Sequence, residues 1–165
     1  MVAHWTLDEK TRVDLALSAE DSEGLIDVIR AIVTAGRSAG LLDGVVMLDI
    51  DPWTLKPIAR LVSSVLEIVS TVGPQYLWSP VFEALNEAVF EEHMESIAIV
   101  ATPCAAQAVR RLKASTNPRL QPYQDAIRLT LAVFCTGIYR PEMVEEILVK
   151  RMDVPREQVK RLEIS

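Results

Sequence analysis

The sequence is poor in the residues that assemble common catalytic and cofactor sites. Its 165 residues include only two cysteines, two histidines and six glycines. Cys104 and Cys135 each stand alone in an apolar context, so clustered thiolates for zinc or an iron–sulfur centre are not expected within this chain. Both are expected to pack as small hydrophobic side chains. Neither a phosphate loop nor a dinucleotide fingerprint can be assembled from so few glycines, and we predict no cofactor and no metal.

Long apolar runs are also missing. A membrane-spanning helix needs roughly 18 consecutive uncharged apolar residues, and no window supplies them. The nearest candidate, residues 61–82, is interrupted by Glu67, Gly73, Pro74 and Pro80. The first ten residues have neither the basic segment nor the apolar run of a secretory signal, so we expect a cytoplasmic protein.

The chain is rich in apolar residues. Half of its residues are hydrophobic and the mean hydropathy is +0.20. Without a spanning helix, this content predicts either a well-filled core or a surface covered by a partner. The length is consistent with a single domain over residues 1–165.

Charge is distributed unevenly along the chain. Residues 1–100 carry a net charge of −10 and residues 101–165 carry +4, for a total of −6. Such asymmetry suggests either two halves with complementary surfaces or a bipolar surface that orients a partner. The acidic total argues against nucleic-acid binding.

The stretch from Asn117 to Tyr139 predicts the central helix of the fold. Asn117 and Pro118 suit the N-cap and the first helical position. Apolar residues then recur at three- and four-residue steps, and no charge occurs from Leu129 to Tyr139. We therefore expect a helix over 117–139 that is buried all round in its second half.

Prolines at positions 52, 80, 103, 118 and 141 each suit the start of a further helix. The first is expected to reach Gly73, with a kink or later start suggested by Pro57, the second to continue towards Val100, and the third to run through Lys113. A helix is also expected from Glu23 that stops by Gly40. The predicted fold is all-α, a single-domain bundle of seven or eight helices around the helix at 117–139. Leu41–Ile50 is the ambiguous segment, because its β-branched run also suits a buried strand. With no second strand-like run to pair with it, a short helix or an apolar loop is favoured.

Four glutamates, Glu83, Glu87, Glu91 and Glu95, recur every four residues and so ascend one side of the helix expected there. We interpret this row of glutamates as a solvent-exposed face of the helix. The alternative is a docking surface, either for a basic partner or for the chain's own Arg110–Arg119 region. A carboxylate metal site is not expected, because the Glu-x-x-His pairs of di-iron bundles are missing and His93 is interpreted as a surface or helix-end residue.

Aromatic side chains gather around the Gly73–Pro80 link, in the set Trp53, Tyr76, Trp78 and Phe82. Uncharged Trp and Tyr beside proline suit an anchor for a partner protein or for a membrane interface. The alternative is that they fill the core.

Two segments resemble an uncharacterised family of small helical proteins. They are Ser38–Asp43 (SAGLLD) and Asn117–Gln121 (NPRLQ), the latter followed by the apolar stretch to Gly137. The chain departs from the family at Arg128-Leu129-Thr130, where the family places a glycine, and by continuing 28 residues past Gly137. The family accompanies cytoplasmic formate dehydrogenases and heterodisulfide-reductase-like complexes, so the resemblance implies a non-catalytic companion of a redox complex.

Three hypotheses follow. The first is a non-catalytic accessory subunit of a cytoplasmic multi-subunit assembly such as a redox complex, with other protein subunits as partners and with the four glutamates and four aromatics above as contacts. The second is a homo-oligomeric scaffold or coat-like protein. The third is an enzyme whose site is assembled from scattered residues such as Glu87, Glu91 and His93.

Overall fold

The computed structural model describes residues 2–8, 11–16, 22–51, 53–54, 56–70, 80–132, 140, 142, 146–155 and 158. Within them, only the backbone is described for residues 2–8, 11–16, 22–26, 28, 69, 70 and 148. No helix in these ranges is long and apolar enough to cross a membrane.

The centre of the fold is a four-stranded mixed sheet with the strand order β4-β3-β5-β6. The strands β3 (Gly44–Ile50), β5 (Ile97–Ala101) and β6 (Ile127–Ala132) run parallel, and β4 (Pro57–Val62) pairs antiparallel with β3. A separate antiparallel pair is formed by β1 (Val2–Asp8) and β2 (Thr11–Ala16).

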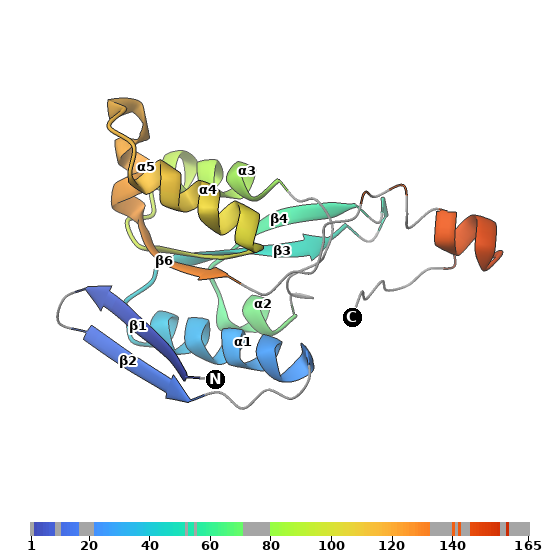
Figure 1. Cartoon of the computed structure of the whole chain (residues 1–165), viewed down its shortest axis with the longest axis horizontal. Helices are drawn as coiled ribbons and strands as arrows, with labels where there is room; N and C mark the ends of the chain where they lie inside the picture. The colour runs from blue at the N-terminus through green and yellow to red at the C-terminus, as the bar shows by residue number, and fades with distance from the viewer. Residues whose placement is uncertain are drawn as a thin grey trace.

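Helices cover both faces of the four-stranded sheet (Figure 1). On one face lie α1 (Ser22–Ser38) and α2 (Val65–Ser70). On the other lie α3 (Val81–Asn86), α4 (Pro103–Lys113) and α5 (Gln121–Ala126). Three short helical segments are also described: the π-helical η1 (Glu87–Glu91) and η3 (Glu146–Arg151), and the 3-10 helix η2 (Pro118–Leu120).

The core is divided into two clusters, one on each face of the sheet. Consecutive residues of β3 alternate between them: Val46 and Leu48 pack with α3, whereas Val45 and Met47 pack with α1 and α2. The same alternation continues in β5, where Ile99 joins the first cluster. Because both faces are covered, β3 and β5 consist largely of apolar residues, as is typical of parallel strands.

The all-α prediction is therefore wrong, and the predicted central helix at 117–139 is its clearest failure. Asn117 does act as an N-cap, since its Oδ1 accepts the backbone N–H of Arg119 at 3.0 Å. Helix extends only through η2 and α5, and the chain then enters β6, where Ile127, Leu129 and Leu131 alternate with Arg128 and Thr130. Residues 133–139 lie outside the described ranges.

The prediction of a short helix or an apolar loop over Leu41–Ile50 is also wrong, because Gly44–Ile50 forms β3. The premise that no second run could pair with it fails as well. The run Ile97–Ala101, expected to continue the preceding helix, is β5, which pairs with both β3 and β6.

Two other helix predictions are confirmed. α1 ends at Ser38, and Gly40 follows with a left-handed φ of 68°, the conformation that stops many helices. α4 begins at Pro103 and ends at Lys113 as expected.

The helix expected between Pro52 and Gly73 is wrong over Pro57–Val62, which forms β4, and α2 begins only after Ser64. Ser64 Oγ accepts the backbone N–H of Glu67 at 3.2 Å, while a Glu67 carboxylate oxygen accepts the backbone N–H of Ser64 at 3.1 Å. This reciprocal pair is a capping box, and it fixes the start of α2.

Candidate ligand site at the carboxyl edge of the sheet

The topology creates one position where a ligand can lie between strand ends. After β3 the chain turns outward into β4, whereas after β5 it crosses over through α4 to β6, on the other side. The connections thus leave the carboxyl ends of the adjacent parallel strands β3 and β5 in opposite directions. In open parallel sheets, ligands bind outside the carboxyl ends of the strands at such a switch point.

The β5 side of this switch point is formed by the first turn of α4. Thr102 occupies the N-cap position and is 5% exposed. Its side chain makes no capping hydrogen bond, and its Oγ1 instead lies 3.2 Å from Cys104 Sγ. The first backbone N–H groups of any α-helix have no partner within the helix, and the positive end of the helix dipole lies beside them.

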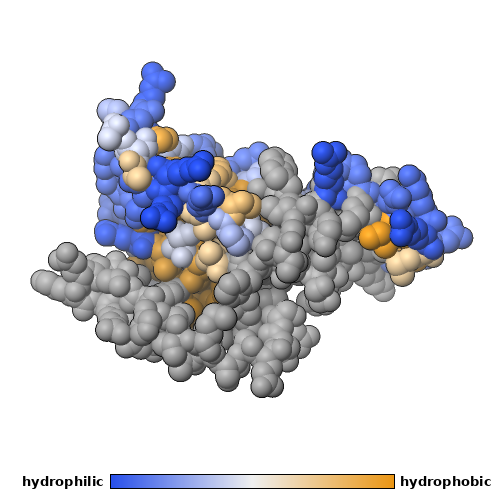
Figure 2. Space-filling view, in the orientation of Figure 1, coloured by the Kyte–Doolittle hydropathy of each residue, from blue (hydrophilic) through white to orange (hydrophobic). Residues whose placement is uncertain are grey.

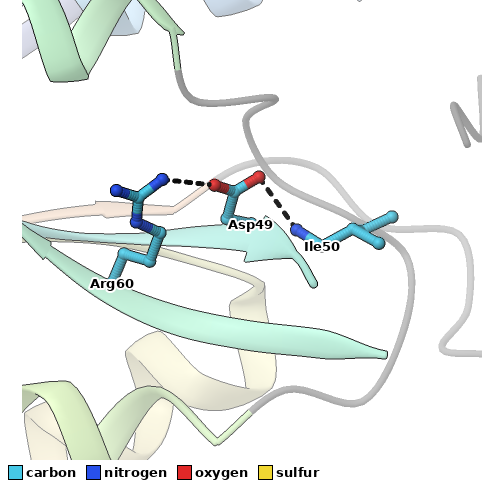
Figure 3. A network of polar contacts seen from close by, with 3 residues as sticks. All are labelled: Asp49, Ile50 and Arg60. Carbon is cyan, nitrogen blue, oxygen red and sulfur yellow. Dashed lines mark hydrogen bonds and ion pairs between the residues drawn. The ribbon is translucent and has the colours of Figure 1, made fainter. Parts of the chain in front are cut away.

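The β3 side carries Asp49, a carboxylate that is 8% exposed (Figure 3). One of its oxygens, Oδ2, accepts a hydrogen bond from the Arg60 guanidinium on β4 at 3.0 Å, and the other accepts the backbone N–H of Ile50 at 2.9 Å. The β3–β5 register runs Val45↔Ala98 and Val46↔Ile99. Continuing that register puts Asp49 level with Thr102, and these are the two buried polar side chains of the described residues.

The loop between β3 and β4 is held by Asp51. Its Oδ1 accepts the backbone N–H groups of Thr54 at 2.7 Å and Trp53 at 2.8 Å. The Thr54 hydrogen bond is the main cause that lowers the pKa of the Asp51 carboxyl, and the Trp53 bond lowers it further. Trp53, which lies in this turn, is 88% exposed.

Chemically, this edge suits an anionic ligand. Helix N-termini bind phosphate and carboxylate groups through free backbone N–H groups and the helix dipole, and the Thr102 hydroxyl adds a donor. Among the residues that the structure describes, no three His, Cys, Asp or Glu side chains lie where they could hold a metal ion.

The predicted partner contacts lie elsewhere. Glu83, Glu87 and Glu91 are exposed along α3 and η1, and Phe82 is exposed beside them. Glu95 lies beyond the end of η1, in the turn before β5. Of the aromatic set, Trp53 lies in the turn between β3 and β4, while Tyr76 and Trp78 fall outside the described residues, as does Cys135. Cys104 is exposed, contrary to its expected burial.

Sequence reasoning missed Thr102, Asp49 and Arg60. A signal existed for the first two, because each follows or ends an apolar run of strand length, Val45–Leu48 or Ile97–Ala101. Polar residues at the ends of buried strands are candidates for ligand contacts. Reading both runs as helix or loop concealed the signal.

Comparisons with known proteins show that the chain is similar to subunits of redox complexes. A family model for the C terminus of the coenzyme F420 hydrogenase/dehydrogenase beta subunit (FrhB_FdhB_C) matches residues 94–165, a segment that includes β5 and α4. An uncharacterized protein of Methanocaldococcus jannaschii is 34% identical over 143 residues, which are 81% of this chain and 40% of that protein. The coenzyme F420 hydrogenase subunit beta of Methanococcus voltae is 30% identical over 122 residues, which are 72% of this chain and 42% of the subunit.

The fold is shared as well. A chain of the F420-reducing NiFe hydrogenase complex from Methanosarcina barkeri matches with a TM-score of 0.71 at 18% identity, covering 87% of this chain and 51% of that one. This chain thus spans about half the length, or less, of the relatives it matches. The resemblance to a family associated with redox complexes is supported, but the shared fold is α/β, so the expectation of a helical family is corrected accordingly.

Proposed function

We propose that this chain is the coenzyme-binding part of a β-subunit-like protein in a multi-subunit redox complex, and that it binds coenzyme F420 at the carboxyl edge of the sheet. The observation that carries the proposal is the position of the α4 N-terminus at the switch point between β3 and β5. Two similarities support the choice of ligand: the family-model match over residues 94–165, which include this helix, and the identity to a coenzyme F420 hydrogenase subunit beta.

The residues at this edge fit the chemistry of the coenzyme. Coenzyme F420 is an anionic deazaflavin, and when bound it supplies a hydride-carrying centre. The α4 N-terminus and the Thr102 hydroxyl would hold an anionic group. The Asp49–Arg60 pair, fixed from β3 and β4, would position the neighbouring strand end. This proposal replaces the prediction of no cofactor.

Within the complex, the chain would bind and orient the coenzyme, and other subunits would supply its reaction partners. The predicted lack of a catalytic role of its own and the single domain over residues 1–165 stay predictions. The relatives' names, which describe hydrogenase subunits, support protein subunits as partners.

Thr102→Val tests the site. Purified chain titrated with coenzyme F420 should quench the coenzyme's fluorescence on binding. Removing the hydroxyl should raise Kd about fivefold to tenfold, since a net hydrogen bond contributes about 1 kcal/mol and each 1.4 kcal/mol is tenfold. Inorganic phosphate should compete with the coenzyme, because both require the helix N-terminus.

Thr116→Val is the matched control, because Thr116 is exposed in the loop after α4 and should leave Kd unchanged. Thermal melting monitors folding of each variant. A folded chain that does not bind the coenzyme, or one whose Kd responds equally to both substitutions, would contradict the proposal.

A further inference from the structure

The outer face of α3 and η1 presents aromatic and acidic side chains in two adjacent rows. Phe82 and Phe90 are 41% and 48% exposed, although the surface around this helical layer is mostly hydrophilic (Figure 2). Glu83, Glu87 and Glu91 form the second row, and all three are exposed. We call these five residues the Phe–Glu face.

A π turn, η1, forms the second half of this face. The backbone N–H of Glu92 donates to the Glu87 carbonyl at 3.0 Å, a five-residue step. Side chains spaced by four drift around an ordinary α-helix, which has 3.6 residues per turn. The wider turn of a π-helix offsets that drift, and such turns are frequent at functional sites. Because successive residues lie roughly 100° apart around a helix, the phenylalanines and the glutamates occupy neighbouring faces, and Phe90 lies beside Glu87, three residues before it.

Phe90 is also held in place. Its ring meets the ring of Tyr123 on α5 edge to face, with centroids 5.2 Å apart and an interplanar angle of 84°. The Tyr123 hydroxyl in turn donates to Asn86 Oδ1 at 2.8 Å. An exposed ring that is already ordered loses little side-chain entropy on binding, which favours its use as an anchor.

Among the described residues, no basic side chain forms an ion pair with a carboxylate of this face. The ion pairs formed between described side chains are Arg30–Asp27, Arg60–Asp49 and Arg151–Glu146, so the expected pairing of the glutamates with the chain's own Arg110–Arg119 region is not among them. Glutamates four residues apart repel one another by a few tenths of a kcal/mol. A cationic partner would remove that repulsion.

We propose that the Phe–Glu face binds a basic segment of a partner protein through arginine side chains. An arginine can stack its guanidinium on a phenylalanine ring while it donates to the adjacent carboxylate, which lysine does less well. Phe82 and Phe90 are eight residues apart, so at 1.5 Å per residue the two positions are about 12 Å apart. Two arginines separated by seven or eight residues on a partner helix match that spacing. Anionic partners such as nucleic acid would be repelled.

Coenzyme binding is not required for this interaction, which can be tested separately. A fluorescent helical peptide with two arginines seven positions apart is titrated against the 165-residue chain, beside the same peptide with glutamines. We expect the arginine peptide to bind at least about tenfold more tightly at low salt, with the difference shrinking as salt rises. The variant with Glu83→Gln, Glu87→Gln and Glu91→Gln should lose most of the difference, and Phe90→Leu should weaken binding about twofold to fivefold.

Glu95→Gln is the matched control. The Asp43 carboxylate accepts the backbone N–H groups of Glu95 at 3.0 Å and Ser96 at 2.9 Å, which takes the chain away from the helix toward the sheet. This variant should bind as the unmodified chain does, and all glutamine variants should melt at or slightly above the temperature of the unmodified chain, because the replaced groups are exposed and the triple variant loses the repulsion. The inference is overturned if the two peptides bind alike, if neither binds, or if Glu95→Gln acts as strongly as the triple variant.

Discussion

Replacing Ile99 with alanine is expected to lower the free energy of unfolding by about 2–5 kcal/mol, the range for removing a buried isoleucine side chain. Ile99 is fully buried in the middle of β5, in the cluster that also contains Val46, Leu85 and Val109. The residual cavity would lie between the sheet and the layer formed by α3 and α4, where elements on both sides restrict collapse. Equilibrium unfolding in urea measures the loss through the change in midpoint.

A substitution at the neighbouring residue, Val100, tests whether β5 is buried on both faces of the sheet. Val100 faces the opposite cluster, with Val33 and Ile68, so Val100→Ala should also destabilise the protein, although the two substitutions touch different layers. Leu66→Ala is the control for side-chain size, because Leu66 is 83% exposed and its loss should change stability by no more than about 0.5 kcal/mol. A negligible effect at Ile99 would mean that β5 is not a central strand.

The layered fold could have been predicted from β3 and β5 themselves. Both are short apolar runs bounded by polar or turn residues, Asp43 and Asp51 around the first and Ser96 and Thr102 around the second. Length decides such cases, since runs of five to seven residues suit buried strands better than helices. Considered alone, each run lacks a pairing partner, whereas in the sheet each is the partner of the other.

The sequence prediction around β6 fails for a different reason. Leu120, Tyr123, Ile127 and Leu131 fit a helical period, and the helix does begin where the N-cap predicts. From Ile127 onward a two-residue alternation fits equally well, and pairing with β5 decides in its favour. Local spacing cannot make that choice, because the energy that selects the strand comes from a neighbour about 30 residues earlier in the chain.

The candidate sites were only partly accessible from sequence. Spacing by four correctly grouped Glu83, Glu87 and Glu91, because a helix does run there, but it could not show that Glu95 leaves the helix or that Phe90 is held by Tyr123. The carboxyl-edge site depends on which strands are adjacent. Strand order is a long-range property, so Asp49 and Thr102 could be brought together only after the sheet was known.

Gly44→Ala is expected to destabilise the protein by about 1–3 kcal/mol, the usual cost of overpacking a well-filled core. Gly44 begins β3, and a Cβ at this position would lie 2.5 Å from the Met94 sulfur and 3.3 Å from Leu61 Cδ1. Met94 follows His93, whose left-handed φ of 52° ends the α3–η1 segment and directs the chain toward β5. The methionine therefore packs directly over the strand backbone, and a methyl group on Gly44 must displace it.

A double-mutant cycle with Met94→Ala separates this contact from a general weakening of β3. Met94→Ala alone should destabilise the protein, because the side chain packs against the cluster on the α3 side of the sheet. In the Gly44→Ala background the same substitution should cost less, since the new methyl group fills part of the vacated space, giving a coupling of about 0.5–3 kcal/mol between the two sites. Additive effects in urea unfolding would mean that the glycine is required for another reason. The coupling would link the turn after η1 to the first residue of the central strand, a contact that adds to the packing of Val81, Leu85 and Ala88 in holding the Phe–Glu face against the sheet.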